Sequence, residues 1–387
     1  MNKVFCVLGM LASIFLAGCA SQSATPAYPT LLPSIEVLPY PTEVKLAPTS
    51  SIIPTLKPSA ATGKSTERVY FSVVSSSGID PWTKIGWLSL GCLAEQNACQ
   101  SSIQTLPDSY QQNMADAPVW SPDGRRFALV SNSNGEASED IFIMDANGEN
   151  PFNLTHSPQR EDHPVWSPDG AYLLYTKIFN DSEIWITRPD GTDPRKVVDG
   201  DIPAWSPDGR QILYIASRGQ NGKTTIAIIN VTGGDPVWEM TVGNSVYDLA
   251  WSPDGSQFAV GTSDGMLLMD RNGSYQNQFA PNLFRISDLA WSPDGRYIAF
   301  LASAARQAPP DLYTIHAYGS GLVNLTQSPL GVVSPASWSP DSNWLVYDSP
   351  IDSGRGNIFL SNPNGSKQYQ LTRSDGRLDY MTPSWQP

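Results

Sequence analysis

One pentapeptide, Trp-Ser-Pro-Asp-Gly, recurs along the sequence and constrains the fold more than any other feature. Complete copies begin at Trp120, Trp166, Trp205, Trp251 and Trp291. A sixth copy at Trp338 has Ser342 in place of glycine, and a seventh begins at Trp385, where the C-terminus cuts it off. The spacings of 46, 39, 46, 40, 47 and 47 residues match the length of a four-stranded propeller blade. The repeat therefore predicts an all-β chain folded as a β-propeller.

Each repeat has the same order of apolar and turn segments. An apolar stretch follows the motif, as at 127–130, and a second one comes next, as at 141–145. The second stretch usually ends in a polar-glycine pair such as Asn147-Gly148, whose residues tolerate the positive φ of tight hairpins. A short Asn-Leu-Thr segment, as at 153–155, completes the unit. Together with the motif strand, these segments predict four antiparallel strands in each blade.

The motif itself can be interpreted as a hairpin turn. Proline sets φ at the first central position, aspartate accepts nearby backbone N–H groups, and glycine relieves the exit of the turn. The tryptophan ends the preceding strand and offers a large flat surface that can wedge between adjacent blades. Because a single blade cannot bury both of its faces, the ring has to close on itself.

The two ends of the repeat region predict how the ring closes. Residues 69–74, 84–90 and 102–106 have the pattern of the second, third and fourth strands of a blade that lacks its first strand. Residues 382–386 have the pattern of a first strand without successors. Paired together, they would make one blade from both termini, which predicts seven four-stranded blades. The alternative is six blades, with the N-terminal region packed outside the ring.

The repeats resemble those of a known family. The Trp-Ser-Pro-Asp-Gly hairpin, the Asp-Ile-Phe-Ile-Met-Asp strand at 140–145 and the Asn-Leu-Thr segment are similar to the repeats of TolB-like β-propellers over residues 68–387. They also resemble the propeller domains of prolyl-oligopeptidase-like enzymes. The first resemblance implies a periplasmic protein that binds envelope partners, with a six-bladed propeller and a separate N-terminal α/β domain. This sequence departs from that pattern, because it predicts seven blades and a tether in place of the α/β domain.

Residues 1–18 have the pattern of a lipoprotein signal peptide. Lys3 precedes a mostly apolar run that is too short to span a bilayer. The Leu-Ala-Gly-Cys that follows resembles a bacterial lipobox, which predicts cleavage before Cys19 and lipidation of its thiol; the alternative is an ordinary signal peptide with a chance cysteine. Residues 19–66 contain eight prolines and predict a disordered, partly polyproline tether. Residues 67–387 would then be a propeller held by lipid on the extracytoplasmic face of a membrane.

Cysteine content and charge narrow the remaining possibilities. Apart from Cys6 in the signal peptide and the lipidated cysteine, only Cys92 and Cys99 remain, and such a pair in an exported protein predicts a disulfide. The formal net charge of −13 would repel phosphate backbones, so we expect no nucleic-acid partner. Basic proteins and cations fit this charge better.

Acidic residues recur just upstream of the motif tryptophans, at the predicted start of the innermost strand. Each lies three or four residues before its tryptophan: Asp116, Asp162, Asp201, Asp248 and Asp288. His163 follows one of them, whereas the sixth and seventh units carry Ser334 and Met381 instead of an acid. In a propeller these strand starts converge around one mouth of the central channel, so the carboxylates would favour cations or a basic peptide segment. The alternative is that each aspartate only caps its strand.

Signals for catalysis and metal binding are weaker. The pentapeptide Gly-Thr-Ser-Asp-Gly around Ser263 matches a nucleophile elbow, but that motif needs a strand-to-helix turn and this one falls between two predicted strands. His156, His163 and Asp162 lie close in sequence without a known ligand spacing. We therefore predict no catalytic residue, no metal site and no cofactor.

These features together predict a non-enzymatic binding scaffold. The lipid on Cys19 would hold a monomeric propeller in the cell envelope, where its acidic mouth binds a protein or another ligand. The alternative is a propeller enzyme, similar to a lactonase or a lyase, with a pocket in the central channel. A third possibility is a structural spacer.

Overall fold

The repeats fold into antiparallel sheets, as the sequence predicts. The computed structural model describes residues 45–46, 67–75, 82–94, 98–106, 118–131, 138–179, 181–219, 222–328, 330–331, 334–351, 355–374 and 377–387. All of them belong to one compact unit, Glu43–Pro387. The signal peptide, Cys19 and Asp116 lie outside the described residues, so the roles that the sequence predicts for them stay predictions. Among the described residues, no helix is long and apolar enough to cross a membrane.

Within the described residues, five sheets have four strands each, and all pairings in them are antiparallel. The first sheet contains β5 (Val119–Trp120), β6 (Arg126–Ser131), β7 (Asp140–Asp145) and β8 (Phe152–Asn153). The second contains β9 (Arg160–Trp166), β10 (Leu173–Ile178), β11 (Ser182–Thr187) and β12 (Arg195–Asp199). The third contains β13 (Asp201–Trp205), β14 (Gln211–Arg218), β15 (Thr224–Asn230) and β16 (Trp238–Val242). A fourth contains β24 (Ser337–Trp338), β25 (Leu345–Ile351), β26 (Arg355–Ser361) and β27 (Gln368–Gln370).

The fifth four-stranded sheet joins the two ends of the repeat region. It contains β28 (Leu378–Trp385), β2 (Arg68–Ser75), β3 (Trp82–Ser89) and β4 (Gln104–Thr105). The C-terminal β28 pairs with β2 from Val69↔Trp385 to Ser75↔Leu378. This pairing agrees with the predicted joining of N- and C-terminal strands, while closure of the whole ring stays a prediction.

One larger sheet has eight strands because a single long strand serves two repeats. It contains β17 (Val246–Trp251), β18 (Gln257–Thr262), β19 (Asp264–Asp270), β20 (Tyr275–Trp291), β21 (Tyr297–Ser303), β22 (Pro310–His316), β23 (Val323–Asn324) and β1 (Lys45–Leu46). β20 pairs with β19 before Phe284 and with β21 after it, and β1 pairs in parallel with β23. Divided at β20, the sheets are compatible with seven blades, and the blade number itself stays a prediction.

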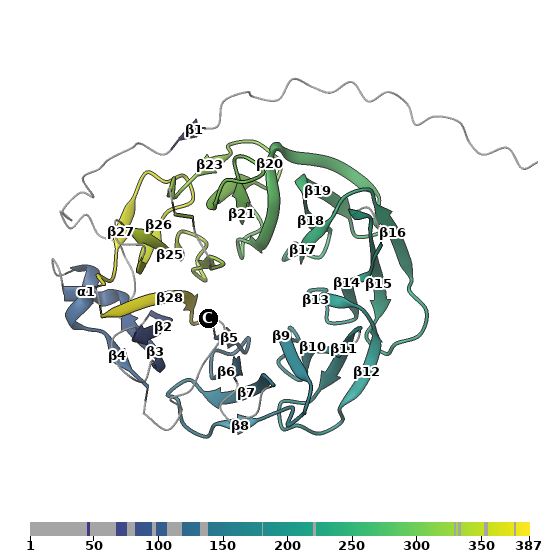
Figure 1. Cartoon of the computed structure of the whole chain (residues 1–387), viewed down its shortest axis with the longest axis horizontal. Helices are drawn as coiled ribbons and strands as arrows, with labels where there is room; N and C mark the ends of the chain where they lie inside the picture. The colour runs from purple at the N-terminus through teal and green to yellow at the C-terminus, as the bar shows by residue number, and fades with distance from the viewer. Residues whose placement is uncertain are drawn as a thin grey trace, which may run out of the picture. The chain divides into compact units, whose positions relative to one another are not determined.

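The sheets stand around a common centre, with the motif strands innermost (Figure 1). β9, β13, β17 and β28 lie toward the centre, and β8, β12, β16 and β27 lie at the periphery (Figure 1). The starts of the motif strands are therefore gathered at one end of the centre, and their turns at the other.

The motif turn is held by a serine–aspartate pair in the five complete copies and in the sixth, which has Ser342 in place of glycine. The serine Oγ donates to the aspartate Oδ1 at 2.6–2.7 Å, and the aspartate accepts the backbone N–H two residues on. The motif glycines have φ between 64° and 71°, and Ser342 takes the same conformation with φ of 61°. The turn chemistry predicted from the sequence is confirmed.

The substitution Ser206→Ala tests this turn. The buried Ser206 donates to Asp208 and accepts the N–H of Gln211, so alanine removes one hydrogen bond from Asp208 and takes from the Gln211 N–H its serine acceptor. We expect the free energy of unfolding, measured with urea, to fall by about 1–2 kcal/mol. The matched control is Ser274→Ala at an exposed serine, which should change it by less than about 0.5 kcal/mol. Equal effects of the two substitutions would contradict the role of the pair.

The motif tryptophans wedge between successive repeats, as predicted. Four of them donate their indole Nε1–H to a backbone carbonyl of the preceding repeat, at 2.9–3.2 Å: Trp166 to Val119, Trp205 to Val165, Trp291 to Ala250 and Trp338 to Ala290. Each of these bonds ties one inner strand to the next, so the repeats stabilise one another.

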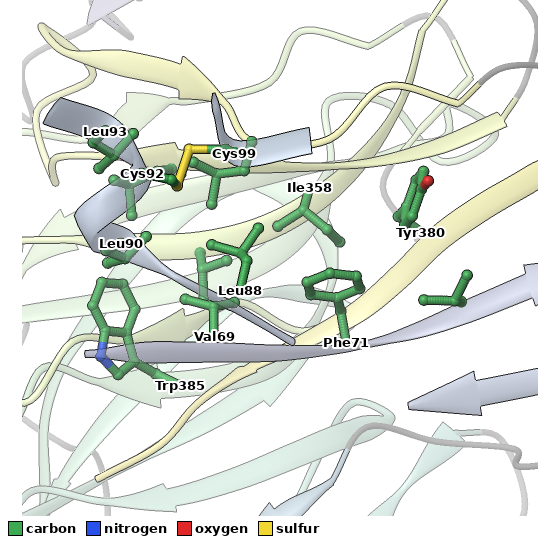
Figure 2. Packing of buried hydrophobic residues seen from close by; sticks show 14 residues of the cluster. Val69, Phe71, Leu88, Leu90, Cys92, Leu93, Cys99, Ile358, Tyr380 and Trp385 are labelled. Atoms are coloured by element: carbon green, nitrogen blue, oxygen red, sulfur yellow. A yellow bond between two sulfur atoms is a disulfide. The ribbon is translucent and has the colours of Figure 1, made fainter. Parts of the chain in front are cut away.

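The joining sheet has its own apolar core, which includes the disulfide (Figure 2). Val69, Phe71 and Trp385 pack there against the pair Cys92–Cys99, whose disulfide confirms the sequence prediction. The disulfide connects the 3-10 helix η1 (Leu90–Ala94) to α1 (Ala98–Ser101). The strand expected at 102–106 is shorter, because the N–H and hydroxyl of Ser102 bond to the Cys99 carbonyl and extend the helical turn.

Candidate functional site

The acidic residues singled out from the sequence lie near the start of the inner strands, at the end opposite the motif turns. Asp162 is in β9, Asp201 begins β13, Asp248 is in β17 and Asp288 is in the second half of β20. We call these four aspartates, with His163, the inner acidic site. The structure distributes them into two groups with different electrostatic surroundings.

A β-bulge recurs at this point of the inner strands. The register of β9, β13, β20 and β28 with its neighbour shifts two or three residues before the motif tryptophan. The first bulged residues have positive φ, although none is glycine: His163 (52°), Ile202 (49°), Asp288 (54°) and Thr382 (50°). Side chains rarely adopt this conformation, and bulges re-aim the residues that they contain. The bulge thus changes the direction of the chain where the acidic site is built.

Asp162 and Asp201 form the first group, and each has a basic partner. Both accept the backbone N–H of the next residue, at 2.8 Å. Asp162 also pairs with Arg160 at 3.0 Å, and Asp201 pairs with Arg218 at 3.5 Å. For these two residues the capping role expected as the alternative is present, and an arginine offsets their charge.

Asp248 and Asp288 form the second group, on successive inner strands. Asp248 accepts the N–H of Leu249 at 2.7 Å and the N–H of Leu289 at 2.6 Å, so its carboxylate bridges β17 and β20. Asp288 accepts the Ser287 hydroxyl at 2.8 Å. His163, on β9, also interacts electrostatically with Asp288. The fold therefore brings together Asp248, Asp288 and His163, although His163 and Asp288 are 125 positions apart in the sequence.

Burial changes the protonation of this second group. Burial raises the pKa of Asp248 to about 7, and the charge of Asp288 adds to the increase while the Leu289 N–H opposes it. Burial also raises the pKa of Asp288, against the lowering effects of the Ser287 hydroxyl and of His163. Burial thus favours the protonated form of Asp248, and the site gains negative charge as the pH rises.

The sequence analysis missed two buried carboxylates near this end of the strands. Asp348, in β25, is 1% exposed, and burial raises its pKa to about 6 while Ser334 partly offsets this. Ser334 occupies the position at which other repeats have the inner aspartate. In this repeat the acidic side chain, Asp348, lies instead on the neighbouring strand, β25. In the sequence, this buried carboxylate was indicated only by a charged residue within the mostly apolar run 345–349.

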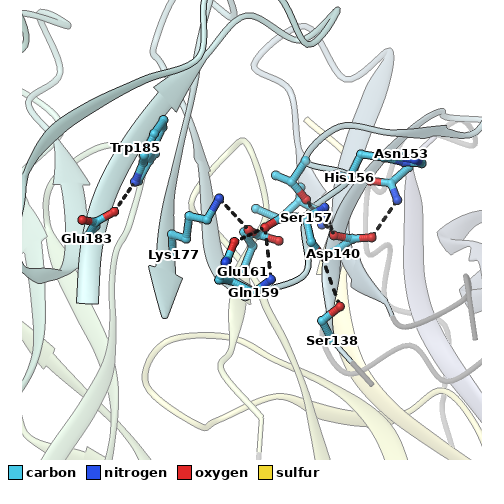
Figure 3. A network of polar contacts seen from close by, with 12 residues as sticks. Ser138, Asp140, Asn153, His156, Ser157, Gln159, Glu161, Lys177, Glu183 and Trp185 are labelled. Carbon is cyan, nitrogen blue, oxygen red and sulfur yellow. Dashed lines mark hydrogen bonds and ion pairs between the residues drawn. The ribbon is translucent and has the colours of Figure 1, made fainter. Parts of the chain in front are cut away.

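The second missed carboxylate is Glu161, which is fully buried beside Lys177 at 3.6 Å (Figure 3). Burial raises the pKa of Glu161. Nearby, Asp140 accepts the side chain of Asn153 at 2.7 Å and the N–H of Ser157 at 3.1 Å, which explains the Asn-Leu-Thr segment as a structural motif (Figure 3). These contacts stabilise the repeat rather than add to the inner acidic site.

The other residues considered from the sequence are Ser263 and His156. Ser263 lies in the hairpin between β18 and β19, and its hydroxyl donates to Asp264 at 3.0 Å. His156 has φ of 46° and donates its N–H to Asn153. Among the described residues, no group of three or more His, Cys, Asp or Glu side chains is placed to hold a metal ion.

Solved structures with the same fold include a TolB protein, a lyase and a peptidase. TolB from Acinetobacter baumannii is 16% identical with a TM-score of 0.50, and the match covers 83% of each chain. An oligogalacturonate lyase in complex with manganese is 14% identical with a TM-score of 0.52, over 68% of this chain and 78% of that one. A puromycin-hydrolyzing peptidase from Mycobacterium tuberculosis is 16% identical with a TM-score of 0.56, over 78% of this chain but only 53% of the peptidase. These identities establish the fold alone.

Family membership follows from the repeats themselves. A search of curated proteins finds no significant match. Residues 102–293 match the model of the TolB beta propeller domain. The matched stretch contains four complete copies of the motif and the start of the fifth, at Trp291. The chain is therefore a TolB-like β-propeller repeat protein.

Proposed function

We propose that this chain is a lipid-anchored, non-enzymatic binding protein of the cell envelope. In this proposal Cys19 carries the lipid and residues 19–66 form the tether. The inner acidic site binds a basic segment of an envelope or extracellular protein. The TolB-like fold supports a protein partner, and the net charge of −13 favours a basic one.

The observation that carries the proposal is the pair Asp248 and Asp288. Their carboxylates come from successive inner strands, and the only other charged group that influences their pKa within the described residues is His163. No arginine or lysine of the described chain offsets them, in contrast to Asp162 and Asp201. Two enclosed carboxylates without a cation create a negative potential that a basic side chain would neutralise.

A titration with a short oligolysine peptide tests this proposal. Measured by calorimetry at about pH 8, above the raised pKa of Asp248, the double variant Asp248→Asn/Asp288→Asn should bind the peptide about tenfold more weakly than the wild type, because it loses both carboxylates. The matched control is Asp190→Asn/Asp193→Asn, which removes the same charge from exposed residues at the other end of the repeats. Equal weakening in both double variants would contradict the proposal, since it would show an effect of net charge only.

One observation favours an enzymatic alternative. A carboxyl group with a pKa of about 7, such as Asp248, can act as a general acid or base at neutral pH. A propeller enzyme of the lactonase or lyase type would use it together with a metal in a central pocket. Elemental analysis distinguishes the two functions: a metal retained by purified wild type and lost in Asp248→Asn would favour the enzyme, and metal-free protein would count against it.

A further inference from the structure

A cavity of about 510 Å³ lies between the motif turns of two successive repeats, at the end of the inner strands opposite the inner acidic site. We call it the Trp291 groove. It is lined by Ser252, Pro253, Asp254, Ser256, Gln257, Trp291, Pro293, Asp294, Gly295 and Ala317. The other repeats provide an internal comparison, because the same positions recur at the other interfaces.

The preceding interface shows what fills the position of Ala317. There Arg271 reaches from the hairpin after β19 to the motif aspartate Asp208, at 3.6 Å. Arg271 and Ala317 are equivalent, since each follows the last residue of its strand and donates its backbone N–H to the residue after the motif glycine, Ser256 and Arg296 respectively. Ala146 and Val231 hold this position in two other repeats, so the arginine contact belongs to one interface, and the Trp291 groove has the methyl group of Ala317 there.

A second interface shows what covers the motif tryptophan elsewhere. Arg126 lies over the indole ring of Trp166 in the next repeat, 5.5 Å from its centroid. Gln257 holds the place of Arg126, because each precedes the phenylalanine that pairs with its own motif tryptophan. Trp291 is partly exposed, whereas the other six motif tryptophans are buried to 8% exposure or less.

Among the described residues, one carboxylate of the groove, Asp254, makes no ion pair. Asp254 receives hydrogen bonds from the hydroxyls of Ser252 and Ser256, which hold its pKa below the ordinary value and keep it ionised at neutral pH. Asp294, by contrast, is paired with Arg296 at 2.5 Å. The partly exposed Trp291, the ionised carboxylate of Asp254 and the amide of Gln257 thus line the same cavity.

We propose that the Trp291 groove binds the guanidinium group of an arginine side chain from a partner protein. Within the chain, arginines already make both halves of this interaction, one on an indole face and one on a motif carboxylate. A guanidinium is planar and can stack on Trp291 while it donates to Asp254, whereas an ammonium lacks the plane. This site is separate from the inner acidic site and does not depend on its function.

The test uses N-acetyl-arginine amide as the probe, with its neutral citrulline analogue as the matched ligand. Binding is followed by the indole N–H signal of Trp291 in nitrogen–proton correlation spectra, assigned with Trp291→Phe. This signal reports on the groove and not on the inner acidic site. We expect the arginine probe to shift it, and citrulline to bind about tenfold more weakly, because the cation–π and ionic contacts are lost.

Two variants place an arginine in the groove, at positions where another repeat of this chain has one. Ala317→Arg and Gln257→Arg should each weaken arginine binding about tenfold, while Asn364→Arg, which adds the same charge to an exposed hairpin residue at the same end, should not. Unchanged thermal unfolding shows that the variants are folded. The proposal is overturned if the Trp291 signal does not move, if citrulline and arginine bind equally, or if all three variants behave alike.

Discussion

Replacement of Trp385 by alanine is expected to lower the free energy of unfolding by about 3–5 kcal/mol. Trp385 is 3% exposed and packs in the core that joins β28 to β2 and to the neighbouring sheet. Its backbone N–H also donates to the Ser337 hydroxyl at 3.0 Å, across the same junction. The substitution therefore empties a large cavity where the two ends of the repeat region meet. Urea unfolding followed by circular dichroism measures the effect.

The control for this prediction is an aromatic side chain outside the core. Phe179 is 71% exposed, so Phe179→Ala should change the free energy of unfolding by less than about 0.5 kcal/mol. If Trp385→Ala were as stable as this control, the junction of β28 with β2 would not contribute to the stability of the propeller, and the account of the joining sheet would be wrong.

Replacement of Asp248 by asparagine is expected to stabilise the protein at alkaline pH. The pKa of Asp248 rises from 3.8 to about 7 on folding, so between these values the folded state holds a proton that the unfolded state has released. Wild-type stability must then fall as the pH rises through this window. Asparagine removes the cost, and the gain at about pH 8 is at most about 4 kcal/mol, since each pKa unit corresponds to about 1.4 kcal/mol.

Two features reduce that gain and define the controls. Asparagine has one acceptor oxygen, so it cannot accept both the Leu249 and the Leu289 N–H groups as the carboxylate does. The advantage should disappear below about pH 3, where the wild-type carboxyl is mostly protonated in both states. Unfolding curves at both pH values measure the difference, with Asp190→Asn as the control at an exposed residue. A stability difference that does not change with pH would contradict the raised pKa.

Much of the fold could be predicted because the repeat encodes it locally. The serine, proline, aspartate and glycine of the motif each have a turn role that needs no distant partner, and even the exception at Ser342 takes the glycine conformation. The long strand β20 was not predicted. Its halves belong to different repeats, and only pairing with both β19 and β21 shows that they are continuous. The helical turn before β4 depends on Ser102, a local bond that no pattern indicated.

The candidate site could be predicted only in its position along the strands. Spacing from the tryptophan placed Asp162 and Asp248 alike, yet one pairs with an arginine and the other bridges two strands. The difference arises from the neighbours of each carboxylate, since Arg160 lies on the same strand as Asp162, whereas Leu289 reaches Asp248 from the next inner strand. The sequence also does not reveal the bulges, because they involve Ile202 and Thr382 as well as polar residues. Asp348 escaped prediction since it lies on a second strand. Asp116 stays a prediction, because it lies outside the described residues.

The most direct test of the central claim is a crosslinked pull-down from the native envelope. It compares the wild type with a variant that has asparagine at Asp162, Asp201, Asp248 and Asp288. A matched control removes four exposed acids, at Glu149, Asp190, Asp193 and Asp235. We predict that the wild type and the control capture the same basic partner and that the folded inner-site variant does not. Identical capture by all three proteins would contradict the claim that the inner acidic site binds the partner.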